Sequence, residues 1–287
     1  MPLLANHTSE LAGPNFKADK RASAFPQCSN PRCAKGWLQL WRKRRVPVIE
    51  GGWLCSPECT RARVEELLGR EQVGIGQAGT YRHRVPVGLV LLTRGWITHE
   101  HLRDALEAQR DGCGMRLGEW LVANRGLDEI RLAHALGLQW SCPVFSLEKH
   151  GGGPPVTSVP RLLSESFGFV PLRRAASGIL YLAFEDRMDH SLTLAIERVT
   201  GLRVESGLLP ASEFCAAQER HRQAQFASSR VIEAGSLSLL AGAFAKHIEK
   251  QKPIDSRMAR VRDLFWLRMW RAAGEEEDVI GSVVRFS

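Results

Sequence analysis

The sequence has no apolar stretch long enough to cross a membrane as a helix. A spanning helix needs roughly 18 to 20 uninterrupted apolar residues, and no run within the 287 residues approaches that length. Residues 1–21 also lack the basic segment followed by an apolar core that marks a secretory leader. These absences predict a cytoplasmic protein.

Features of catalysis are missing as well. Scattered histidines such as His99, His101 and His134 do not combine with a carboxylate and a nucleophile at any recognised spacing. The chain has no G-x-x-x-x-G-K-[ST] phosphate loop, so ATP hydrolysis is not expected. We therefore expect a protein that is not an enzyme.

The cysteines do not form an extracellular disulfide pattern. There are seven, of which four lie in two close pairs while Cys113, Cys142 and Cys215 are scattered. An odd number with this clustering favours metal ligation over a disulfide framework.

Length and composition indicate several small units. With 44% hydrophobic residues, the chain can bury one full core and one or two smaller ones, which predicts two to four small units. Its net charge of +8 would suit an anionic partner. Charge alone does not choose among nucleic acid, a phosphate ligand and a membrane surface. The expected fold class is α+β multidomain. The expected units are a flexible tail over 1–27, a four-cysteine zinc module over 28–73, a helical tandem-repeat domain over 82–148, an α/β unit over 158–225 and a helical C-terminal region over 226–287.

The paired cysteines predict a structural zinc site. Cys28-x4-Cys33 and Cys55-x3-Cys59 can each form a tight loop that directs two thiolates inward. Four thiolates give Zn²⁺ a closed tetrahedral shell with no open position for water, as in treble-clef and zinc-ribbon modules. Reduced cysteines that only pack, or a redox pair, are the alternatives.

Aromatic and basic residues alternate between the two cysteine pairs. Trp37, Trp41 and Trp53 surround the basic run Arg42–Arg45. Such a segment can stack bases and neutralise phosphates, whereas three tryptophans beside a small metal site can equally form its local core.

Two segments of 24 residues, 86–109 and 116–139, form an internal repeat with an offset of 30 residues. Each copy is expected to be a short helix, a turn and a second helix, because its apolar residues recur at i, i+3 and i+4. Thr98 and Asp128 share one offset and are good N-caps for the second helix. The matched pairs are Gly88 with Gly118, Leu91 with Leu121, Leu92 with Val122, Ile97 with Leu127, Leu102 with Leu132, Ala105 with Ala135, Leu106 with Leu136, and Gln109 with Gln139.

The pattern changes after Pro143. Residues 167–173 and 179–185 have strand composition, and a helix ending at Gly201 leads to a further strand and to a helix from Ser212, which is a βαβ-like order. The segment 256–273 is expected to be an amphipathic helix that packs on the protein itself, on a partner or at a membrane interface.

The tandem motif resembles a known domain. The pattern R-L-G-x-x-L ending in L-x-x-A-L-x-x-Q, followed by GLQWSCPVFSLE and an α/β unit, is similar to the amino-terminal domain of general secretion pathway protein E. In particular it resembles the variant that binds cyclic di-GMP in type IV pilus ATPases. The resemblance covers residues 84–220 and does not include the ATPase motor. It implies that the two copies together hold the dinucleotide.

The resemblance implies specific ligand contacts. In that family an arginine fork takes the O6 and N7 acceptors of guanine, a glycine permits close backbone approach, leucines cover the base and a glutamine amide donates to phosphate. Pro86 stands where the first copy should have arginine, and Arg84 or Arg82 is a candidate replacement. The alternative is that these residues only build the core and turns of a helical domain. The implied contacts are Arg84, Val87, Gly88, Leu91, Leu92, Gln109, Arg116, Leu117, Gly118, Leu121, Val122 and Gln139.

The expected function is that of a non-catalytic regulatory or adaptor protein related to type II secretion or type IV pilus machinery. Cyclic di-GMP is its expected ligand, and a secretion, pilus or signalling protein its expected partner. The alternatives are a zinc-dependent nucleic-acid-binding regulator and a degenerate ATPase subunit that acts as a scaffold.

Overall fold

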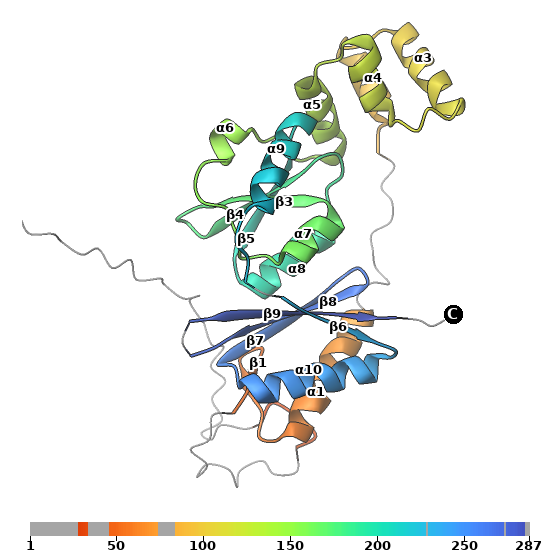
Figure 1. Ribbon diagram of the computed structural model, residues 1–287. Coiled ribbons are helices and arrows are strands. Elements are labelled where there is room, and N and C mark those ends of the chain that lie inside the picture. The colour runs from red at the N-terminus through yellow and green to blue at the C-terminus, as the bar shows by residue number, and fades with distance from the viewer. Residues whose placement is uncertain (1–27, 34–45, 74–83, 228, 273, 285–287) are drawn as a thin grey trace, which may run out of the picture.

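The computed structural model describes residues 28–33, 46–73, 84–227, 229–272 and 274–284 (Figure 1). It combines helices with three small sheets and so confirms the α+β multidomain class. The predicted tail over 1–27 lies outside the described residues. No helix in the described part is long and apolar enough to span a bilayer.

The tandem repeat forms two matching helix pairs, as predicted. The predicted N-caps are confirmed, because Thr98 Oγ1 accepts from the His101 amide at 3.2 Å and Asp128 Oδ1 accepts from the Ile130 amide at 2.7 Å. The helices are α2 (Val87–Thr93) and α3 (His99–Arg110) in the first copy, and α4 (Leu117–Arg125) and α5 (Glu129–Trp140) in the second.

The two copies interlock. Helix α2 of the first copy packs on α5 of the second, and α3 packs on α4. The equivalent residues Leu91 and Leu121 are both fully buried in the shared core. A Cβ on Gly118 would lie 2.7 Å from Leu132 Cδ1, and the equivalent glycine of the first copy has the same close contact. Both copies therefore contribute matched positions to one helical unit.

The α/β unit has the predicted βαβ order. Strands β4 and β5 pair in parallel and are joined by α8, while β3 pairs antiparallel with β4. Asp189 caps the start of α8, and Gly201 ends it at φ +71°. The elements are α6 (Leu147–His150), α7 (Arg161–Phe167), β3 (Phe169–Arg174), β4 (Ile179–Phe184), α8 (His190–Thr200), β5 (Arg203–Leu208) and α9 (Ala211–Arg222).

The prediction of a helix over 256–273 is wrong, and so is the prediction that the whole region 226–287 is helical. This region forms one helix and a four-stranded sheet with the order β6-β9-β8-β7. Its elements are β6 (Arg230–Ala234), α10 (Leu237–Gln251), β7 (Asp255–Val261), β8 (Leu264–Trp270) and β9 (Glu276–Val283).

The sheet is misread from sequence because both of its faces are buried. In β8, Trp266 packs with the core of the α/β unit, while Phe265 and Leu267 pack toward α10. A strand buried on both faces reads as a continuous apolar run, which has no period-2 signature. The two-residue turn of the hairpin, Arg262 and Asp263, has a positive φ of 54° at its arginine and lacks the Asn-Gly or Asp-Gly signal.

The cysteine-bearing segment packs on this C-terminal region. It contains β1 (Val48–Ile49), β2 (Gly52–Trp53) and α1 (Pro57–Val73), and α1 lies beside α10 under the sheet in Figure 1. Leu54, Leu67, Leu68, Leu240 and Phe244 are all fully buried in their shared core. Segments almost 200 residues apart in the chain therefore make one lobe, which we call the cysteine lobe.

Ion pairs join the cysteine lobe to the α/β unit. Glu50, in the turn between β1 and β2, lies 2.9 Å from Arg70 of α1 and 2.7 Å from Arg198 of α8. Arg198 also pairs with Glu71. The pKa of Glu50 is below its ordinary value because, against the opposing effect of burial, hydrogen bonds from both arginines stabilise its charge.

Replacing Asp278 with alanine is expected to destabilise the sheet by about 3–5 kcal/mol, the cost of removing one partner of a buried ion pair, because only the 45% exposed Glu276, at 3.4 Å, would remain beside Arg268. Asp278 accepts from Arg268 at 2.7 and 2.8 Å and from Trp266 Nε1 at 2.7 Å, and the Arg268 side chain is 2% exposed. Glu275→Ala is the control, because its partner Arg271 is 40% exposed and such pairs contribute about 0–1 kcal/mol. Equal losses in urea denaturation would contradict this account.

Candidate functional site

The four predicted metal ligands come together in the cysteine lobe. The Sγ atoms of Cys28, Cys33, Cys55 and Cys59 all lie within 4.8 Å of one another, and two neighbouring pairs are 3.4 and 3.5 Å apart. Zn–S bonds of about 2.3 Å at tetrahedral angles would place the sulfurs about 3.8 Å apart. The four thiols therefore fit one metal ion.

Local backbone contacts hold the two cysteine pairs against each other. The Cys33 amide donates to Asn30 O at 3.0 Å, which closes the first loop, and the Ser29 amide donates to Trp53 O at 2.9 Å. A Cβ on Gly52 would lie 1.8 Å from Ser29 Oγ, so the loop approaches β2 where only glycine fits. The second pair brackets the start of α1.

The thiols differ in their acidity. Burial opposes ionisation of Cys59, but hydrogen bonds from the side chains of Asn30 and Ser56 bring its pKa down to about 7. Burial and the neighbouring thiols raise the pKa of Cys55 well above its ordinary value. Metal binding at neutral pH would therefore release protons from this cluster.

The other cysteines and the basic run stand apart from this cluster. Cys113 and Cys215 are exposed, and Cys142 is partly buried in another core. Trp37, Trp41 and Arg42–Arg45, proposed for nucleic-acid contact, lie outside the described residues. Trp53 is described, and its side chain is half-buried in β2.

A second site is a cavity of about 440 Å³ between the helical repeat and the α/β unit. Helices α4 and α5 form one side, and the turn after β4 and the segment after β5 form the other. In parallel sheets, ligands bind outside the carboxyl ends of the strands, and β4 and β5 both end here. The lining consists of Val87, Arg116, Leu117, Gly118, Glu119, Val122, Ala123, Glu129, Leu132, Ala133, Leu136, Gln139, Trp140, Glu185, Asp186, Arg187, Leu209, Pro210 and Ala211.

Arg116 is the central polar group of this cavity. Its Nε donates to Glu119 at 2.8 Å, and its Nη2 lies 3.3 Å from Glu185 across the boundary between the two units. It also pairs with Asp186. The hydrogen bond with Glu119 and the charges of all three carboxylates raise the pKa of Arg116, so it remains charged.

Six of the residues implied by the family resemblance line this cavity. They are Val87, Arg116, Leu117, Gly118, Val122 and Gln139, of which all but the first belong to the second copy of the repeat. Gln139 Nε2 also donates to Val85 O at 2.8 Å, which ties α5 to the start of the repeat.

The other six implied residues do not line the cavity. Leu91 and Leu121 are fully buried in the core of the repeat, together with the partly buried Leu92, and Gly88 packs against Leu102. Gln109 Nε2 donates to Met115 O at 3.4 Å. The Arg84 guanidinium lies 3.4 Å from the ring centre of Trp140, a lining residue, which places a cation near the cavity. Arg82 lies outside the described residues.

Sequence reasoning missed the half of the cavity that the α/β unit supplies. Asp189 caps α8, whereas Asp186, three residues earlier, pairs with Arg116. Trp140, Glu185 and Arg187 were not singled out. The available signal was the charged run Glu185–Arg187 directly after a buried strand.

Comparison with protein-family models and with curated proteins finds no match. Among solved structures, one described as MshE with cdg is 25% identical, with a TM-score of 0.39, and the match covers 48% of this chain and 99% of that chain. The N-terminal domain of XpsE is 24% identical in two crystal forms. One match covers 47% of this chain and 92% of that chain with a TM-score of 0.34, and the other covers 45% and 90% with a TM-score of 0.28.

Cys59→Ser is expected to release the bound metal and to lower the stability of the cysteine lobe by about 4 kcal/mol or more, as loss of a structural metal does. Colorimetric chelator titration and thermal denaturation measure the two effects. Cys113→Ser is the control, because that thiol is exposed and outside the cluster. Unchanged metal content in Cys59→Ser would show that the cluster is not a metal site.

Proposed function

We propose that this chain is a non-catalytic regulatory or adaptor protein of secretion or pilus machinery that acts in the cytoplasm and binds cyclic di-GMP. The observation that carries the proposal is the position of Arg116, which reaches into the 440 Å³ cavity between two folded units. A ligand there would contact both units, and so could change the relative position of the two units and the surface that they offer to a partner protein.

The cavity has the chemistry to recognise a guanine edge. Guanine offers O6 and N7 as acceptors for a fork of donors, which Arg116 can supply. Its ring and exocyclic N–H groups are donors, and the carboxylates of Glu185 and Asp186 next to Arg116 are acceptors. The base would exchange one set of polar contacts for another without leaving Arg116 unpaired.

Apolar and small residues suit the faces of such a base. Leu117, Val122 and Leu136 line the cavity and can cover an aromatic ring, while Gly118 lets the backbone of α4 come close. Pro86, the N-cap of α2, occupies the position in the first copy that Arg116 occupies in the second, so the first copy supplies no equivalent guanidinium. We infer that the second copy binds one guanine, and that the Arg84 guanidinium, which stacks on the Trp140 ring, pairs with a phosphate of the ligand.

The four-cysteine cluster is proposed to hold structural zinc. Four thiolates complete a tetrahedral shell, and soft sulfur ligands select zinc over magnesium or calcium. The cluster is set against the core shared by α1 and α10, so the ion would hold the cysteine lobe together.

Calorimetric titration of the full chain with cyclic di-GMP is expected to show saturable binding. Arg116→Ala should weaken it by about 1–3 kcal/mol, the value of one bidentate guanine contact. Arg125→Ala is the control, because Arg125 ends the same helix, pairs with Asp104 and does not line the cavity. A flat titration would exclude the proposed ligand, and equal losses in both variants would exclude the proposed contact with Arg116.

Elemental analysis of the purified chain is expected to give about one zinc per chain, as for a four-thiolate structural site. Removal of the ion by a chelator should lower the melting temperature, and added Zn²⁺ should restore it. Iron in place of zinc, or full stability after chelation, would contradict this assignment.

A further inference from the structure

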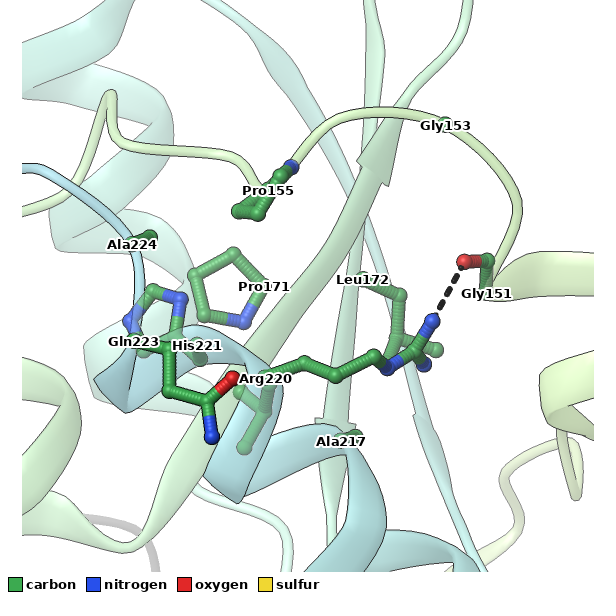
Figure 2. Close-up of a pocket in the computed structure, with 11 residues that line it drawn as sticks. Gly151, Gly153, Pro155, Pro171, Leu172, Ala217, Arg220, His221, Gln223 and Ala224 are labelled. Carbon is green, nitrogen blue, oxygen red and sulfur yellow. Dashed lines mark hydrogen bonds between the residues drawn. The ribbon is translucent and has the colours of Figure 1, made fainter.

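A second, smaller cavity of about 270 Å³ lies within the α/β unit (Figure 2). It is formed by the loop after α6, strand β3 and the last turns of α9. Pro155 on the loop, and Pro171 and Leu172 on the strand, give the cavity apolar walls. Two residues of α9 supply polar groups: the guanidinium of Arg220 and the imidazole ring of His221. This cavity shares no lining residue with the 440 Å³ cavity.

The hydrogen bonds around His221 define the state of its ring. The Ser164 hydroxyl donates to Arg161 O at 2.8 Å, so its oxygen accepts from His221 Nε2, which is 3.1 Å away. Burial lowers the pKa of His221, assisted by the charge of Arg161 against an opposing effect of Glu165. The ring is therefore neutral, and its Nδ1 is an acceptor.

This acceptor is buried without a partner. His221 is 5% exposed, and its Nδ1 has no hydrogen-bond partner among the described residues. A buried polar atom left in this way costs about 1–3 kcal/mol. A hydrogen-bond donor placed in the cavity would remove that cost.

Arg220 adds an unopposed positive charge. Its Nη1 donates to Gly151 O at 3.0 Å, as Figure 2 shows, and no carboxylate of the described residues lies within ion-pair distance of it. No acidic residue lines the cavity. The remaining guanidinium donors are therefore available to an anion.

We propose that this cavity binds a small organic anion that has a hydroxyl group at the opposite end of its carbon skeleton from the acid group, because Figure 2 shows the Arg220 guanidinium beside Gly151 and the His221 ring at the other end of the cavity. The acid oxygens accept from Arg220, the hydroxyl donates to His221 Nδ1, and the carbon skeleton contacts Pro155 and Pro171. The volume suits a compact metabolite, because it is below the range of about 300–1,000 Å³ typical of sites for larger ligands.

The test is a titration of the full chain with 4-hydroxybutyrate and with glycerol 3-phosphate, which represent the carboxylate and phosphate forms of such an anion. Butyrate and propyl phosphate are the matched probes without the hydroxyl. Two-bond ¹H–¹⁵N spectra of ¹⁵N-histidine-labelled protein are expected to show a shift of His221 Nδ1 with at least one hydroxylated probe, and none with its matched probe. No shift with either hydroxylated probe at millimolar concentration, or equal shifts with the matched probes, would overturn the proposal.

Two variants separate binding from folding. Arg220→Gln is expected to weaken the responding probe about tenfold or more, the value of one charge-assisted hydrogen bond. Arg222→Gln is the control, because Arg222 pairs with Glu219 and does not line the cavity. Ala224→Leu keeps both polar groups, fills the space and should abolish binding. Binding retained in both Arg220→Gln and Ala224→Leu would place the probe elsewhere. Arg116→Ala should leave this titration unchanged, so the outcome is independent of cyclic di-GMP.

Discussion

The fold depends on burial of both faces of the sheet β6-β9-β8-β7. Trp266 and Val261 on one face complete the core of the α/β unit, while Phe265, Leu267 and Met269 on the other face complete the core between the sheet and helices α1 and α10. Neither neighbour can move independently without exposing apolar surface. The C-terminal sheet therefore lies between the α/β unit and helices α1 and α10 and fixes their relative positions.

Polar contacts at the edge of this sheet connect it with the turn that lines the larger cavity. Arg262, at the tip of the β7–β8 hairpin, donates to Asp189 at 2.9 and 3.1 Å, and Asp189 caps the helix that follows Arg187. The turn after β4 therefore lines the cavity with residues 185–187 and is attached to the hairpin through Asp189. On the far side, Arg198 of α8 reaches Glu50 of the cysteine lobe. The sheet and these ion pairs connect the larger cavity with the cysteine lobe.

Features set by local residues could be read from the sequence. Apolar spacing and the caps at Thr98 and Asp128 define the repeat, and thiol pairs at short spacing converge because each closes its own loop. The hairpin could not be read in this way, because burial on both faces removes the alternation that marks a strand. The cavity is a further case. Arg116 is visible in its motif, but its partners Glu185 and Asp186 belong to another unit, and only tertiary packing brings them together.

The pairing of α1 with α10 also constrains the order in which the molecule can assemble. Helix α1 leaves the ribosome while its partner, which begins at Leu237, is still unsynthesised. Until then Leu67 and Leu68, both fully buried in the finished protein, have no apolar surface from α10 to cover them. Domains generally fold as units during synthesis, and contacts distant in sequence form late. The helical repeat, whose core includes no residue of the C-terminal sheet, would fold first, and a bound ion at the cysteines would keep the segment around them compact until α10 is synthesised.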